Sequence, residues 1–131
     1  MESSKTAITK GVKITVKVIY RNDISQVESS SYFYNYEIQI ENYNDYPVQL
    51  MHRNWYIFDS LNEINLVSGE GVVGEKPLLK PGESFVYVSG CELFSDLGYM
   101  KGHYTFRNMV TGAQFLVTIP QFALDYPPRL N

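Results

Sequence analysis

Apolar and polar residues alternate with a period of two along much of this chain. Within residues 11–20, valine and isoleucine occupy positions 12, 14, 16 and 18, and lysine and threonine occupy positions 13, 15 and 17. Residues 32–42 repeat the pattern, with tyrosine and isoleucine alternating with polar side chains. Consecutive side chains of a strand point to opposite faces. Both segments are therefore predicted to be strands with one buried face.

Shorter extended runs follow the first two strands, and turn residues separate them. They span residues 48–58, 64–67, 84–89, 103–107 and 114–119. The last two flank Asn108–Gly112 and predict a hairpin. The run at 84–89 carries bulky residues on both faces, so its buried face is not defined by the pattern.

Three segments are predicted to lie outside the strands. Residues 89–102 contain three glycines and are interpreted as a loop with room for one helical turn. A single domain is expected over residues 1–131, with residues 1–10 and 125–131 as flexible tails.

The number and spacing of these segments define the fold class. About seven to eight short antiparallel strands, without a helical periodicity of ten or more residues, predict an all-β domain. A sandwich of two sheets is favoured. A small closed barrel remains the alternative, because periodicity does not distinguish a closed sheet from two stacked ones.

Composition narrows the class of protein further. The chain has 131 residues, of which 44% are hydrophobic and 19% charged, so it can fold around its own core. A net charge of -3 provides no general attraction to phosphate backbones and argues against a dedicated nucleic-acid binder. Cys91 is the single cysteine, and no apolar run approaches the length of a membrane span. We expect a cytoplasmic protein that does not bind membranes.

Residues 69–74 read GEGVVG, which matches the G-x-G-x-x-G pattern of dinucleotide-binding turns. That pattern binds pyrophosphate only where the glycines open a helix. Pro77 and the turn at Lys80–Gly82 leave no room for a helix. The glycines are therefore interpreted as positions of positive φ or close backbone approach.

The same loop is also the candidate for contact with a ligand or partner. A loop of successive backbone amides can bind an anion without a helix. The candidate residues are Gly69, Gly71, Gly74, Glu75 and Lys76.

No arrangement of residues in the sequence predicts catalysis or a cofactor. The serine-elbow and zinc-protease motifs are absent from the sequence. His52, His103, Cys91, Asp59 and Glu92 match no zinc spacing and would form a metal site only if the fold gathered them. We expect no enzyme activity, no cofactor and no metal.

Arg53 and Trp55 are residue types that dominate protein interfaces. A structural role is the favoured interpretation of both. Trp55 then belongs to the core, and Arg53 pairs with Asp59 or Asp45.

Aromatic residues supply the second interface candidate. The chain contains eleven tyrosines, a residue type that tolerates both water and a partner. If Tyr32, Phe33 and Tyr34 form one exposed patch with the glycine-rich loop, that patch is the candidate interface, in which Tyr32 and Tyr34 are the key residues.

Short matches over most of the chain resemble the ApaG family. They lie at residues 36–42 (YEIQIEN), 53–59 (RNWYIFD), 69–77 (GEGVVGEKP), 85–90 (FVYVSG), 98–104 (GYMKGHY) and 119–122 (IPQF). The resemblance implies a fibronectin type III-like or immunoglobulin-like β-sandwich. Lys76 departs from the glutamine that is usual in the family and changes the charge of the loop.

The resemblance implies protein recognition but no known reaction. Bacterial members take their name from a gene beside a diadenosine tetraphosphate hydrolase, and a cobalt and magnesium efflux association is attached to them. Similar eukaryotic domains occur in ubiquitin-ligase substrate receptors and in a protein associated with DNA polymerase. We therefore expect a non-enzymatic module that binds a protein partner. The alternative is a nucleotide- or anion-binding protein linked to diadenosine tetraphosphate or to cobalt and magnesium homeostasis.

Self-association is a further expectation. An exposed edge strand could pair with that of a second copy and give a homodimer.

Overall fold

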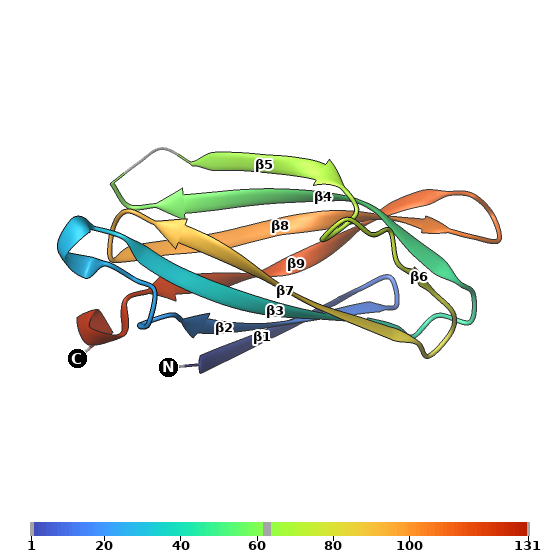
Figure 1. Cartoon of the computed structure of the whole chain (residues 1–131). Helices are drawn as coiled ribbons and strands as arrows, with labels where there is room; N and C mark the ends of the chain where they lie inside the picture. The colour runs from blue at the N-terminus through green and yellow to red at the C-terminus, as the bar shows by residue number, and fades with distance from the viewer. Residues whose placement is uncertain (1, 62–63, 131) are drawn as a thin grey trace.

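A computed structural model describes residues 2–61 and 64–130, and most of them belong to antiparallel strands (Figure 1). The strands are β1 (Glu2–Thr9), β2 (Val12–Tyr20), β3 (Tyr32–Asn42), β4 (Val48–Asp59), β5 (Asn65–Glu70), β6 (Leu78–Leu79), β7 (Ser84–Leu93), β8 (Leu97–Asn108) and β9 (Gln114–Asp125). Two short 3-10 helices, η1 (Val27–Ser29) and η2 (Pro127–Leu130), complete the elements.

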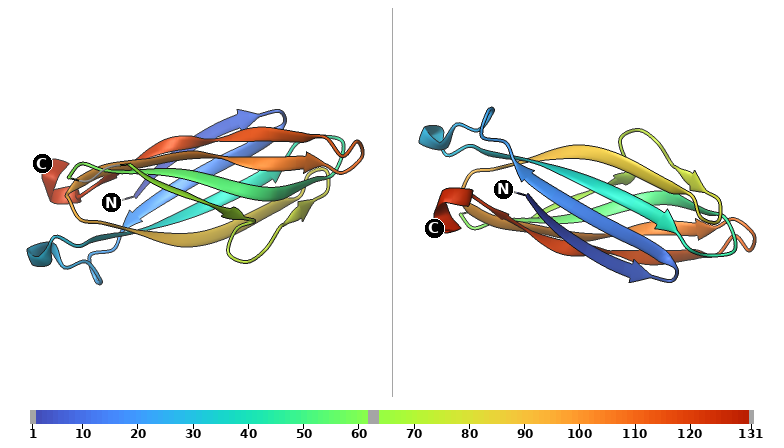
Figure 2. Two further views of the ribbon diagram at one scale, coloured as in Figure 1. Left: turned by 90° about the horizontal axis from the view of Figure 1, so that it is seen from above. Right: turned by 90° about the horizontal axis from the view of Figure 1, so that it is seen from below.

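The strands form two sheets that pack face to face (Figures 1 and 2). One sheet has the order β1-β2-β3-β7, and the other has the order β5-β4-β8-β9 with β6 beside β4. The predicted all-β sandwich is confirmed. The barrel alternative is not formed, because β7 and β5 end their sheets without pairing to each other.

The alternating strands place their apolar residues between the sheets. Ile14 and Val16 of β2 and Ile38 and Ile40 of β3 have no exposed surface, as the period of two predicts. Burial of each such side chain stabilises the fold by about 1.5–3 kcal/mol. On the outer face, cross-strand neighbours such as Lys17 and Glu37 have opposite charge.

Trp55 of β4 lies at the centre of an aromatic cluster between the sheets. Its ring centroid is 5.5 Å from that of Tyr36, 5.9 Å from that of Phe122 and 6.5 Å from that of Tyr104. Its contacts with Tyr104 and Phe122 are edge-to-face, a favoured aromatic geometry. The buried hydroxyl of Tyr104 shares a hydrogen bond with that of Tyr87, so neither phenol is left without a partner.

The expectation of a flexible tail at residues 1–10 is wrong. Residues 2–9 form β1, which pairs with β2 along its whole length. Lys10 and Gly11 make the turn, both with positive φ (47° and 77°), as a two-residue hairpin turn requires. The sequence signal was weak because residues 2–6 are mostly polar, and Met1 lies outside the described residues.

The expectation of a flexible tail at residues 125–131 is also wrong for its described part. Asp125 still belongs to β9, and the ring of Tyr126 packs against Tyr20 and Tyr32 at centroid distances of 5.3 and 5.2 Å. The amide of Tyr126 donates a hydrogen bond to the carbonyl of Asp96 at 3.0 Å. Asn131 lies outside the described residues.

Residues 89–102, expected to be a loop, are instead mostly the end of β7 and the start of β8. Gly98 and Gly102 lie within β8. These positions are glycine because the backbone of β4 approaches them too closely for a β-carbon. A β-carbon would lie 2.3 Å from the Phe58 carbonyl oxygen at Gly98 and 2.1 Å from the Asn54 carbonyl oxygen at Gly102. Glycine within a strand marks such an approach as often as it marks a loop.

The buried phenols predict that the fold is sensitive to alkali. Burial raises the pKa of Tyr34, Tyr87 and Tyr104, and it raises the pKa of the Cys91 thiol to about 11. Above about pH 9 the unfolded chain releases protons that the folded chain retains, so the free energy of unfolding falls as pH rises. Each group contributes a loss of about 1.4 kcal/mol per pH unit until its folded pKa is reached.

Urea unfolding followed by Trp55 fluorescence, together with tyrosinate absorbance, measures this effect. The buried tyrosines are expected to ionise only as the protein unfolds. A free energy of unfolding that stays constant from neutral pH to above the ordinary tyrosine pKa would contradict the prediction.

Candidate functional site

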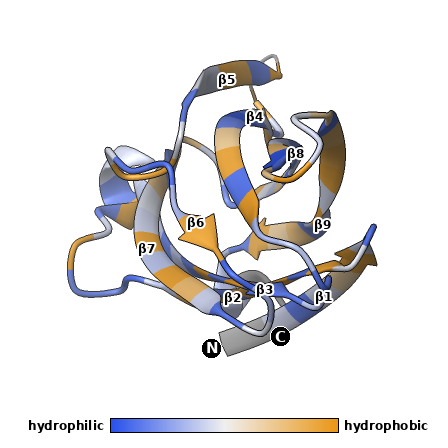
Figure 3. Ribbon diagram, turned by 90° about the vertical axis from the view of Figure 1, so that its right-hand side faces the viewer, coloured by the Kyte–Doolittle hydropathy of each residue, from blue (hydrophilic) through white to orange (hydrophobic). Residues whose placement is uncertain are grey.

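The two long sides of the sandwich differ. On one side β1 lies against β9, and the amide of Thr118 donates a hydrogen bond to Oγ1 of Thr9 at 3.2 Å. On the other side β7 and β5 are the outer strands of their sheets and do not pair with each other (Figure 3). We call this second side, bounded by β7 and β5, the open side.

A cleft of about 340 Å³ lies on the open side. Its lining includes the buried side chains of Trp55, Tyr36 and Met100, with Val67 from β5 and Ser89 from β7. A second hollow, of about 370 Å³, shares Ile57 with the first and includes Leu93 and Phe94. The open side is therefore hollowed along much of its length.

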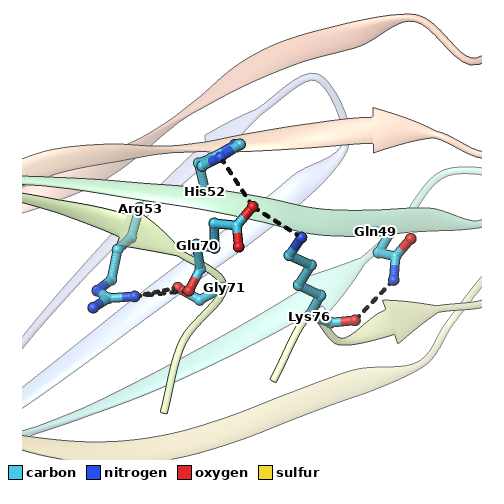
Figure 4. A network of polar contacts seen from close by, with 6 residues as sticks. All are labelled: Gln49, His52, Arg53, Glu70, Gly71 and Lys76. Atoms are coloured by element: carbon cyan, nitrogen blue, oxygen red, sulfur yellow. Dashed lines mark hydrogen bonds and ion pairs between the residues drawn. The ribbon is translucent and has the colours of Figure 1, made fainter. Parts of the chain in front are cut away.

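Arg53 brings a positive charge into the cleft. It lies on the same face of β4 as Trp55 and Ile57, opposite Tyr104 of β8, so its side chain starts from the inward face of the sheet. Nη1 donates hydrogen bonds to the carbonyls of Glu70 and Gly71, both at 2.9 Å (Figure 4). Within residues 2–61 and 64–130, no carboxylate forms an ion pair with Arg53.

The predicted pairing of Arg53 with Asp59 or Asp45 is therefore wrong. Asp59 is buried and accepts hydrogen bonds from the amide of Phe94 at 2.7 Å and from the hydroxyl of Ser95. It thus caps the turn between β7 and β8.

The Arg53 charge affects the phenols around the cleft. Burial raises the pKa of Tyr36 and Tyr87, and the nearby Arg53 guanidinium opposes this rise. The guanidinium therefore remains electrostatically coupled to the aromatic lining.

The three glycines of the G-x-G-x-x-G pattern have three different roles. A β-carbon on Gly69 would lie 2.9 Å from Nη2 of Arg53, so this glycine makes room for the guanidinium. Gly71 has a φ of 60°, and a β-carbon there would lie 2.1 Å from the Glu75 carbonyl oxygen. Gly74 has a φ of 82° and faces open space. The predicted roles in positive φ and close approach are confirmed.

The loop uses its own amides to hold its shape. The amide of Gly71 donates to the carbonyl of Met51 at 2.9 Å, and Val72 and Glu75 exchange hydrogen bonds at 2.8 and 2.9 Å. Val73, between them, adopts a φ of 43°, a strained value for a β-branched residue. The segment continues into β6 and not into a helix, as predicted. These hydrogen bonds leave few amides for a phosphate.

Side chains of β4 tie the loop to the sheet (Figure 4). Gln49 donates a hydrogen bond to the carbonyl of Lys76 at 3.0 Å. Nζ of Lys76 lies 3.4 Å from the carboxylate of Glu70, and Nε2 of His52 lies 3.9 Å from it. Such exposed pairs contribute little stability each. The positive charge of Lys76 is therefore already paired within the loop.

The proposed interface residues do not form one exposed patch. Trp55 and Tyr34 are only 4% and 1% exposed, so Trp55 belongs to the core and neither side chain contributes to an exposed patch. Tyr32 is half-buried against Tyr126.

The exposed apolar surface that sequence reasoning missed lies on β7. Val86 and Val88 point outward and are 50% and 55% exposed. Bulk on both faces of residues 84–89 was the available signal, but it did not show which face is buried.

The fold does not gather the candidate metal ligands into one site. Cys91 is buried, whereas His52 is exposed on the outer face of β4. Within the part of the chain that the structure describes, no three histidine, cysteine, aspartate or glutamate side chains gather to hold a metal ion.

The strand order and the loop define an antiparallel β-sandwich domain of the fibronectin type III-like class. The ApaG domain model matches residues 22–108, so the chain belongs to the ApaG family. Protein ApaG of Mesorhizobium japonicum is 42% identical over 92% of both chains, and that of Agrobacterium fabrum is also 42% identical. The crystal structure of the putative ApaA protein from Bordetella pertussis superposes with a TM-score of 0.85. It is 36% identical and covers 88% of this chain and 94% of its own. Among the described residues, no helix is long and apolar enough to cross a membrane.

The geometry of the loop predicts different costs for two glycine substitutions. Gly74→Ala should lower the free energy of unfolding by about 1 kcal/mol, because it imposes only a left-handed backbone on alanine. Gly71→Ala adds a clash with the Glu75 carbonyl and should cost about 3 kcal/mol. Urea unfolding of the two variants measures the difference. Equal costs would contradict the close approach at Gly71.

Burial also predicts that Cys91 is unreactive in the folded protein. Desolvation is the main cause that raises its thiol pKa to about 11, with the charges of Asp59 and Glu92 adding to it. At about pH 8 its thiolate population should be roughly one hundredfold below that of an ordinary cysteine. Alkylation by iodoacetamide, followed by mass spectrometry, should be slow in buffer and fast in urea. Rapid alkylation in buffer would contradict the prediction.

Proposed function

We propose that this ApaG domain is a non-enzymatic, cytoplasmic module that binds a protein partner along its open side. The observation that carries the proposal is the position of β7 and β5. Each is the last strand of its sheet and has a free outer edge, and a cleft with apolar lining lies between them. An unpaired edge offers backbone hydrogen bonds, and the cleft offers apolar surface.

Exposed apolar side chains surround this side. Val86 and Val88 of β7 are about half exposed, and Leu66 of β5 is 67% exposed. These side chains add apolar surface on the outer faces of the two strands that border the cleft.

The titratable groups of the cleft support a binding role. Tyr36 and Tyr87 have a raised pKa and stay protonated near neutral pH. Neither phenol exchanges a proton easily near pH 7, whereas general acid–base catalysis requires a group that does.

Photo-crosslinking at two matched positions tests the proposal. A benzophenone side chain replaces Val88 on β7 in one variant and Leu116 on β9 in the other. The native residues are 55% and 56% exposed, respectively. In cells that naturally produce the protein, the variant at position 88 should form a defined, stoichiometric adduct with a partner. The variant at position 116 should not.

Equal labelling at both positions, or none at position 88, would contradict the proposal. Equilibrium dialysis against diadenosine tetraphosphate, cobalt and magnesium is the companion measurement. Saturable binding of one of these, with no adduct at position 88, would favour the nucleotide, anion or metal alternative.

A further inference from the structure

We propose that the occupant of the open side is an extended acidic segment of the partner, which pairs with the edge of β7 and places a carboxylate on Arg53. This inference rests on the proposed interaction role and specifies the chemistry of the partner.

The ladder between β3 and β7 shows which backbone groups of β7 are unpaired. The amide of Asn42 donates to the carbonyl of Glu83, whereas the carbonyl of Phe33 accepts from Arg21 on the opposite side of β3. Even positions of β3 therefore face β7, and odd positions face β2. Val86, Val88 and Gly90 are opposite odd positions, so their amides and carbonyls point to the free edge.

The edge of β7 lacks the features that usually prevent strand pairing. Ten consecutive residues pair with β3 without a bulge, and the strand contains neither lysine nor proline. The other outer strands differ, because β1 contacts β9 and carries Lys5, and β5 has only six residues. The edge of β7 is therefore the best template for a further strand.

Arg53 determines the charge of the segment. Its Nη1 is occupied by two loop carbonyls, and no hydrogen bond from Nε or Nη2 is present within the described residues. A guanidinium has five N–H donors, and a carboxylate can accept two of them at once. Since no carboxylate of the described chain pairs with Arg53, the partner can supply one.

A single extended peptide can both pair with the edge of β7 and place a carboxylate on Arg53. In a strand added to β7, alternate side chains point toward the same side as Tyr87 and Ser89, which line the cleft with Arg53. We infer a glutamate or aspartate at one of these positions, with apolar residues two positions before and after it to contact Val67 and Ile57.

A second copy of this chain fits less well. The inward-facing residues of its β7 are Phe85, Tyr87, Ser89, Cys91 and Leu93, and none carries a carboxylate. A β7–β7 dimer would therefore leave Arg53 without an anion.

Selection of twelve-residue peptides from a random display library on the full chain tests the inference. Selected peptides should share an acidic residue flanked by apolar residues at alternate positions. In fluorescence anisotropy, Glu→Gln in the peptide should weaken binding by about tenfold or more. Arg53→Gln should weaken the parent peptide similarly and remove the preference for glutamate over glutamine. Arg107→Gln, which removes the same charge from an exposed position of β8, should leave affinity unchanged.

Two further measurements address strand pairing. Bound peptide should slow amide hydrogen exchange at Val86, Val88 and Gly90, and methylation of alternate peptide nitrogens should abolish binding. Val88→Pro should block the edge while leaving the β3 ladder intact, because the amide of Val88 faces away from β3. The Glu→Gln peptide and hydrogen exchange use the wild-type chain, so they test the inference even if Arg53→Gln does not fold.

Other outcomes overturn the inference in distinguishable ways. Peptides that bind the open side without an acidic preference, or without protecting the β7 amides, overturn it and leave the interaction role standing. A library that yields no binder to the open side overturns it, and the Val88 crosslink then decides the interaction role. A dimer in light scattering that Val88→Pro dissociates would assign the edge to a second copy.

Discussion

The packing of both sheets around Trp55 is the constraint on which the rest of the structure depends. The indole contacts Tyr36 from one sheet and Tyr104 and Phe122 from the other. Because side chains alternate along β4, burial of Trp55 also turns Arg53 toward the inward face. A charged group at this position needs polar partners. The last residue of β5 and the first residue of the loop after it supply them as two backbone carbonyls.

This requirement explains the glycine-rich segment at residues 69–74. Gly69 makes room for the guanidinium, and the positive φ of Gly71 turns the chain at the point where the Glu70 and Gly71 carbonyls accept its hydrogen bonds. A segment that matches the pattern of a nucleotide-binding turn therefore serves here to hold the side chain of Arg53. No carboxylate of the described residues pairs with this guanidinium, which lies beside the cleft with Nε and Nη2 free to donate to a partner.

The two sides of the sandwich treat their edge strands differently. The hairpin of β1 and β2 brings β1 against β9 and so protects that side. Among the described residues no such strand covers β7, although its edge is long and regular. Soluble proteins usually block such edges, because an unblocked edge pairs with other chains. The open side is distinguished from the rest of the described surface by the free edge of β7 beside Arg53, an arginine that forms no ion pair with the described residues.

The period of two by itself determined the fold class and the buried face of β2 and β3, because alternation is a local property of a strand. The glycine-rich segment was also interpreted correctly from its neighbours, since prolines act locally. Other features depend on contacts distant in sequence. Gly98 and Gly102 are glycines of a strand that the backbone of β4 approaches closely, and this approach is not visible in the sequence. The hydrogen-bond partners of Arg53 are two backbone carbonyls, which no residue type reveals. The open side itself was decided only by the tertiary structure, because which strands lack a neighbour follows from sheet order and not from any single segment.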